Sequence, residues 1–171
     1  MIIIGERLNS SRRAIRVALD NRDKDFLIKE ALNQAKAGAH YLDVNVSALA
    51  EQEIELLRWL VPLIQSQVDL PLSIDSPNPE ALAVGLAVHR GRPFLNSLTL
   101  EKNRWTALIP LIKEYKPLVI ALCLDESGLP DSPEKTLELA QRIREGLERE
   151  GIDVTSVYFD PLVRPVGINF K

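Results

Sequence analysis

Acidic and amide side chains close six short apolar runs that are spread along the whole chain. The residues at the ends of these runs are Glu6, Asn9, Asp43, Asn45, Asp75, Asn96, Asp125 and Asp160. An ionised carboxylate accepts hydrogen bonds, whereas a carboxamide both donates and accepts them. A set of such groups suits a ligand that carries neighbouring N–H donors and carbonyl acceptors along one edge. The aminopyrimidinone edge of a pterin is one ligand of this kind.

Stretches with helical periodicity separate the apolar runs. Residues 25–38, 51–67 and 104–115 place apolar side chains at helical spacing, and Asn78 and Ser132, each followed by Pro and Glu, are typical helix starts. Alternating strands and helices predict an α/β protein with a parallel sheet. Polar residues close every strand and no Gly-rich turn follows the first one, which favours a TIM (β/α)8-type barrel over an open doubly wound sheet. We therefore expect the polar residues to converge at one end of a barrel.

The chain is shorter than a complete barrel. Eight strand–helix units take about 250 residues, and this sequence of 171 residues has its sixth apolar run near residues 156–163. We expect residues 1–171 to form one barrel domain, C-terminally truncated after the sixth strand. Its first and sixth strands would be exposed edges. The chain is then either a fragment or is completed by a second chain, as a homodimer or with another partner.

Composition narrows the class of protein. A net charge of −3 does not indicate binding to nucleic acid or to an anionic membrane surface. One cysteine, Cys123, fits a reducing compartment, and no apolar stretch approaches the roughly 20 residues of a membrane span. We therefore expect a cytoplasmic protein. His40 and His89 are too scattered for a metal site, which takes three or four ligands, so no metal ligands are expected.

Five segments together resemble one enzyme family. The chain resembles the methyltetrahydrofolate:corrinoid (iron-sulfur) protein methyltransferases, whose pterin-binding barrel is shared with the folate module of cobalamin-dependent methionine synthase and with dihydropteroate synthase. The similar segments are IGERLN at 4–9, AHYLDVNV at 39–46, SIDS at 73–76, LNS at 95–97 and YFDPL at 158–162. Each motif alone is weak, but five in order at consistent spacing are specific. The resemblance covers residues 1 to about 165 and about two thirds of the family's barrel.

The resemblance implies roles for particular residues. Asp75, Asn96 and Asp160 resemble the residues that hydrogen-bond the pterin ring. Asp43 and Asn45 resemble second-strand residues near that ring, and Glu6 and Asn9 resemble first-loop residues that shape the floor of the pocket. An asparagine near N5 of the pterin lies on the family's seventh strand and has no counterpart in this sequence. The catalytic group is therefore left unassigned.

The resemblance also implies the chemistry. In the family, the N5 methyl group of methyltetrahydrofolate passes to the Co(I) centre of a separate corrinoid protein. Such a displacement needs a proton or a hydrogen bond near N5, which makes the pterin a better leaving group. The cobalt carries the nucleophilicity, and the barrel positions and polarises the pterin. The implied substrate is thus methyltetrahydrofolate, and the implied partner is a corrinoid (cobalamin-type) protein.

Two other functions stay open at this point. A dihydropteroate synthase-like enzyme would join a pterin pyrophosphate to an aminobenzoate. The Asn-x-Thr-x-Asp-Ser-Phe stretch typical of that family does not follow Ile4. A non-catalytic fragment or subunit would bind pterin, or a partner chain, without turnover.

Overall fold

Six parallel strands form one sheet in the order of the sequence. The computed structural model describes residues 1–163, and neighbouring strands pair in parallel from first to last. The strands are β1 (Ile4–Asn9), β2 (Tyr41–Asn45), β3 (Leu72–Asp75), β4 (Phe94–Leu98), β5 (Leu118–Leu122) and β6 (Val157–Asp160). This sequential order is that of consecutive units in a (β/α)8 barrel. The prediction of an α/β, barrel-type chain with six units is confirmed.

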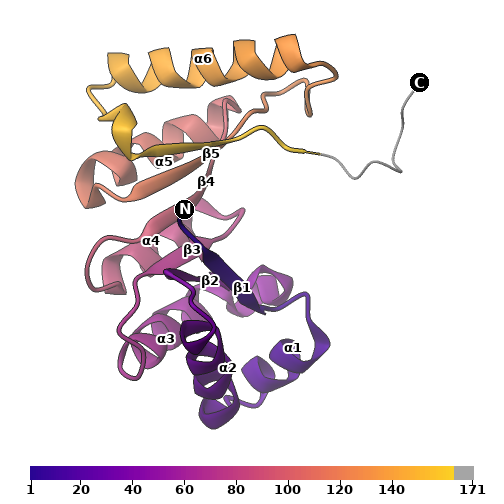
Figure 1. The fold of residues 1–171 in the computed structure, drawn as a ribbon, viewed down its shortest axis with the longest axis vertical. Helices are drawn as coiled ribbons and strands as arrows, with labels where there is room; N and C mark the ends of the chain where they lie inside the picture. Colours follow the sequence, from indigo (N-terminus) through magenta and orange to yellow (C-terminus); the bar gives the residue numbers. More distant parts are fainter. Residues whose placement is uncertain (164–171) are drawn as a thin grey trace.

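Helices follow the strands along the chain and cover one face of the curved sheet (Figure 1). They are α1 (Arg13–Asp20), α2 (Lys24–Lys36), α3 (Glu53–Gln65), α4 (Pro79–Val88), α5 (Lys102–Tyr115) and α6 (Pro133–Arg149), with short 3₁₀ turns η1 (Ser47–Gln52) and η2 (Val154–Ser156). The predicted helix starts are confirmed, because Asn78 caps α4 and Ser132 caps α6. The helix α1 was not predicted. Within residues 1–163, no helix is long and apolar enough to cross a membrane.

Aromatic rings from alternate strands show that the sheet is curved. Tyr41 of β2 and Phe94 of β4 lie edge to face with centroids 4.7 Å apart, and Phe94 and Tyr158 of β6 do so at 5.1 Å. Each of these pairs skips the strand between its partners, so the rings meet across the concave side of the sheet. Layers built from alternate strands are the way a (β/α)8 barrel fills its interior.

The two faces of the sheet differ in chemistry. On the convex face, Leu42, Val44, Ile74, Val119 and Ala121 are fully buried in the apolar core that the strands share with the helices. On the concave face, polar residues stand two positions after each aromatic ring of the layer, since side chains alternate along a strand. These residues are Asp43, Asn96 and Asp160. The apolar side chains of the strands therefore pack against the helices, and the polar side chains point to the concave face.

The aromatic layer allows a test of the curvature. Phe94 is 1% exposed, and Phe94→Ala is expected to lower the free energy of unfolding by about 3–5 kcal/mol, as for a buried aromatic ring. Phe159 in β6 is 38% exposed, so the matched change Phe159→Ala should cost less than about 1 kcal/mol. Urea denaturation of both variants measures the difference. Equal losses would contradict the packing of Phe94 between Tyr41 and Tyr158.

Candidate functional site

Four side chains from three neighbouring strands form a hydrogen-bonded group at the C-terminal ends of the strands. Asn45 Nδ2 donates to Asp75 Oδ2 at 2.7 Å, and Asn96 Nδ2 donates to Asp43 Oδ1 at 3.3 Å. The second bond reaches from β4 to β2 across β3, so it depends on the curvature of the sheet. The strand register places Asn45, Asp75 and Asn96 beside one another. We call Asp43, Asn45, Asp75 and Asn96 the strand-end cluster.

Asp43 is the most deeply buried member of the cluster, with 3% of its surface exposed. Its Oδ1 also accepts a 2.7 Å hydrogen bond from Ser73 Oγ. Burial is the largest cause that raises the pKa of Asp43, and the charges of Asp75 and Glu6 raise it further. The hydrogen bonds from Ser73 and Asn96 lower it. The resulting pKa is about 7. The carboxyl group therefore holds a proton in acid solution and releases it near neutral pH.

Asp75 is only half-buried and lies at the mouth of the cluster. Burial raises the pKa of this carboxyl above its usual value, and the charge of Glu6 acts in the same direction. The hydrogen bond from Asn45 and the charge of Arg104 lower the pKa. Asp75 can thus carry a negative charge in a partly desolvated place because an amide and a guanidinium support it.

The other three predicted residues lie on the same sheet but are engaged differently. Glu6 and Asn9 lie within β1 rather than after it, and the charge of Glu6 acts on both acids of the cluster. Asn9 Oδ1 accepts the Ser11 N–H at 2.9 Å, a local turn contact. Asp160 pairs in register with Leu122 and accepts the Leu162 N–H at 2.7 Å. The structure thus groups Asp43, Asn45, Asp75 and Asn96, with Glu6 acting on them electrostatically, while β5 separates Asp160 from Asn96.

A cavity of about 830 Å³ opens beside the cluster at the C-terminal ends of β3, β4 and β5. Its lining residues are Asp75, Ser76, Pro77, Pro79, Ser97, Thr99, Glu101, Lys102, Asn103, Arg104, Leu122, Leu124 and Glu126. This volume lies within the range of about 300–1,000 Å³ for small-molecule sites. The active sites of (β/α)8 barrels lie at this end of the strands. The cavity and the cluster together form the candidate site.

Comparison with known proteins assigns the family. A family model described as "Pterin binding enzyme" matches residues 5–170. The chain belongs to this family of pterin-binding enzymes. The recognition made from the five strand-end segments is confirmed.

Two kinds of curated protein are among its relatives. Over 179 aligned residues it is 33% identical to the methylcorrinoid:tetrahydrofolate methyltransferase of Eubacterium limosum, a match that covers 100% of this chain and 66% of the relative. It is 28% identical over 169 residues to the methionine synthases of Mycobacterium tuberculosis and Mycobacterium leprae, which covers 95% of this chain and 14% of theirs. The chain thus spans less than two thirds of the relatives it matches. The name of the first of these relatives refers to methyl transfer between a methylcorrinoid and tetrahydrofolate.

Two features of the candidate site were missed in the sequence. The side chain of Arg104 reaches from α5 to backbone carbonyls after β3 and β4. Glu53, 3% exposed at the start of α3, accepts a 2.7 Å hydrogen bond from Ser76 Oγ, next to Asp75. Both contacts join distant segments. The one signal for Arg104 was its place in the first turn of the helix that follows β4, where a long side chain can reach the strand ends.

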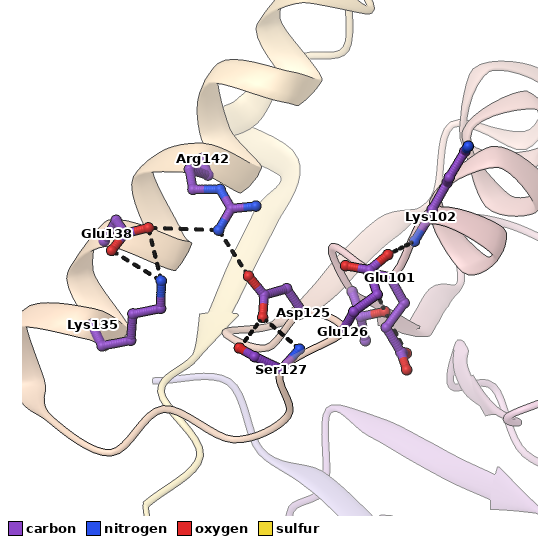
Figure 2. Close-up of polar contacts among 9 residues, drawn as sticks. Glu101, Lys102, Asp125, Glu126, Ser127, Lys135, Glu138 and Arg142 are labelled. Atoms are coloured by element: carbon purple, nitrogen blue, oxygen red, sulfur yellow. Dashed lines mark hydrogen bonds and ion pairs between the residues drawn. The ribbon is translucent and has the colours of Figure 1, made fainter.

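Leu124 and Glu126, in the loop after β5, line the cavity, and Figure 2 shows the polar contacts of this loop. Asp125 accepts hydrogen bonds from the backbone and hydroxyl of Ser127 and an ion pair from Arg142 of α6 at 2.8 Å. These bonds, that of Ser127 Oγ first, lower the pKa of Asp125 to about 2. Glu126 accepts the N–H of Lys102 at the start of α5, at 2.6 Å. Asp125 is therefore a buried acid with a structural role in this loop.

Residues 1–163 contain no group of three or more His, Cys, Asp or Glu side chains that could hold a metal ion. Cys123 is buried, as expected of a small apolar residue in a strand-end segment. The described side chains of the candidate site offer hydrogen bonds, charge and an acid, Asp43, that exchanges a proton near neutral pH. The binding roles assigned to individual residues from the family resemblance stay predictions.

The raised pKa of Asp43 predicts a pH dependence of stability. Between about pH 4 and pH 7 the native state holds a proton that the unfolded state has released, so this group lowers the free energy of unfolding as pH rises. Asp43→Asn keeps an oxygen for Ser73 and Asn96 but cannot ionise. Its stability relative to wild type should therefore increase across this range, by at most about 4 kcal/mol at 1.4 kcal/mol per pKa unit. Urea unfolding between pH 4 and 8 measures the trend.

A control of opposite sign is Asp125→Asn. The pKa of Asp125 is lowered to about 2, so this group stabilises the native state above about pH 4 and the stabilisation is lost as the pH falls. The variant should be less stable than wild type by about 1 kcal/mol at pH 7, after allowance for solvent screening. The deficit should fade toward pH 2. A difference between Asp43→Asn and wild type that does not change with pH would exclude the proton on Asp43.

Proposed function

We propose that this chain binds the pterin ring of a folate at the strand-end cluster and serves methyl transfer between N5 of that folate and a corrinoid protein. The observation that supports the proposal most directly is the cluster itself, whose acids and amides stand beside a cavity of about 830 Å³. Family membership and the methyltransferase relatives agree with it.

The cluster fits the polar edge of a pterin. Asn45 holds one oxygen of Asp75, which fixes the orientation of the carboxylate at the cavity wall. An ionised carboxylate can accept two parallel N–H bonds, and the 2-amino group and N3 of a pterin offer them side by side. Asn96 can present both a donor and an acceptor to the ring. Asp160, on the same face, would contact the ring from the side of β6, as the family resemblance implies.

The transfer can be written with its electrons and protons balanced. When the methyl group leaves N5 for the cobalt of the partner's corrinoid, it leaves its bonding electron pair on nitrogen. N5 then needs a proton or a strong hydrogen bond, because a neutral amine leaves far more easily than its anion. The chain's own contribution is to orient the ring, neutralise its charge changes and limit access of water. Methylcorrinoid:tetrahydrofolate methyltransferase, the relative, is named for the reverse direction, and both directions use the same pterin contacts.

The proposed partners follow from the same chemistry. A corrinoid protein would approach the C-terminal end of the strands, since N5 must face the cobalt. A homodimer or a complex with another partner chain is the proposed assembly, and the cytoplasm is the proposed compartment. Analytical ultracentrifugation of the chain, alone and with a corrinoid protein, tests the assembly.

Binding is tested by calorimetric titration with N5-methyltetrahydrofolate. Wild type should bind saturably, and Asp75→Asn should weaken binding by about 1.5–3 kcal/mol, a loss of at least tenfold, as for a charge-assisted hydrogen bond in a desolvated site. Asp20→Asn makes the same change of charge at an exposed residue of α1 and should bind like wild type. A folded wild type that does not bind the folate would overturn the proposal.

The reaction is tested separately. Incubation of the chain with labelled methyltetrahydrofolate and a reduced corrinoid protein should move the label to the corrinoid, or from a methylcorrinoid to tetrahydrofolate. Formation of a pterin–aminobenzoate product from a pterin pyrophosphate would support the dihydropteroate synthase-like alternative. Folate binding without either reaction would support a non-catalytic pterin-binding subunit.

A further inference from the structure

The guanidinium of Arg104 joins the ends of two strands of the site. From the first turn of α5 it donates to the carbonyl oxygen of Ser97 at 2.7 Å, of Pro77 at 2.6 Å and of Ser76 at 2.9 Å. These are charge-assisted bonds, and the planar fork of arginine holds its acceptors in fixed directions. Arg104 thus ties the loop after β3 to the end of β4.

Two of these carbonyls belong to residues that follow members of the strand-end cluster. Ser76 comes directly after Asp75, and Ser97 comes directly after Asn96. The backbone N–H of Ser76 also donates to the carbonyl of Asn96 at 3.0 Å. A displacement of Arg104 would therefore loosen both strand ends where their side chains face the cavity.

The charge of Arg104 has a second role, because Asp75 stands among other acids. The titratable and polar groups that surround Asp75 are Glu6 of β1, Asp43 and Asn45 of β2, Glu53 of α3 bonded to Ser76, Asn96 of β4, and Arg104 and Glu101 of α5. Burial and Glu6 raise the pKa of Asp75, whereas Asn45 and Arg104 lower it. Burial lowers the pKa of Arg104, and the charges of Glu101 and Asp75 raise it.

We propose that Arg104 is a positioning residue of the pterin site, which fixes the ends of β3 and β4 through its fork and faces Asp75 with a positive charge. The inference rests on the proposed function, because it names what prepares Asp75 to bind the ring. It gives Arg104 a role in holding the protein's own backbone, since three of its five N–H donors bond backbone carbonyls.

The test compares two substitutions that separate charge from geometry. Arg104→Gln removes the charge, and Arg104→Lys keeps the charge but removes the fork. Arg92→Gln is the matched control, because Arg92 also donates to a backbone carbonyl, that of Lys116, and to Ser156 Oγ. Arg92 lies just before β4, at the opposite end of the sheet. The affinity for N5-methyltetrahydrofolate is measured from pH 5.5 to 8.5, and the pKa of Asp75 is measured in the free protein by carbon NMR of its carboxyl group.

Arg104→Gln should raise the pKa of Asp75, because a positive charge that lowers this pKa is removed. Its affinity should then fall off at a higher pH than that of wild type, because an acid must be ionised to accept both N–H bonds. Arg104→Lys should keep the pH profile of wild type and bind about tenfold more weakly at every pH, for loss of the fork alone. Arg92→Gln should match wild type in both measurements.

Each result decides the inference. An unchanged pKa of Asp75 and an unchanged pH profile in folded Arg104→Gln would overturn it, and so would wild-type affinity in Arg104→Lys. If Arg104→Gln does not fold, Arg104→Lys with its NMR titration still tests the fork against the charge. If wild type does not bind the folate, the proposed function fails, and the NMR titration of the free protein still shows whether Arg104 acts on Asp75.

Discussion

Several carboxylates crowd together on the concave face of one curved sheet, and the rest of the site depends on how their charges are accommodated. Asp43 and Asp75 lie on adjacent strands, with Glu6 acting on both. Like charges this close in a partly desolvated place cannot all ionise at ordinary cost. One of these acids must take up a proton, and the others need hydrogen-bond donors or a positive charge beside them. The fold supplies both solutions within four consecutive strands.

The two acids receive different solutions, which gives them different properties. Asp43 is nearly inaccessible to solvent and has a pKa of about 7, so it is the acid that holds a proton below neutral pH. Asp75 faces the cavity, receives a hydrogen bond from Asn45 and lies within the field of Arg104. When Asp43 is protonated, its carboxyl group is neutral and does not repel the carboxylate of Asp75. In this way the buried member keeps the exposed member available for a ligand.

Local sequence patterns were sufficient for the strands and the cluster, and insufficient for their long-range supports. Each strand segment is an apolar run that ends in a polar residue. The order of the strands and the proximity of Asp75 and Asn96 could therefore be predicted from the sequence alone. The helix α1 begins after Arg12, which makes no side-chain cap, so its start had no signal. The ion pair of Asp125 had no local signal, because its partner Arg142 lies 17 residues away, in the middle of α6. The contacts of Arg104 were missed as well, because its acceptors are backbone carbonyls, which no sequence pattern marks.

Recognition of the ring and choice of reaction are separable in this architecture. The strand-end cluster comes from β2, β3 and β4, and its supports come from α3 and α5. In the proposed function these contacts orient the ring and do not involve N5, so they are compatible with different chemistries at that atom. Function on a barrel is set by the residues that meet the reacting atoms rather than by the fold. In the proposed function, a site assembled on three strands and held by one arginine would specify the ligand class, and the groups that approach N5 and the partner protein would specify the reaction.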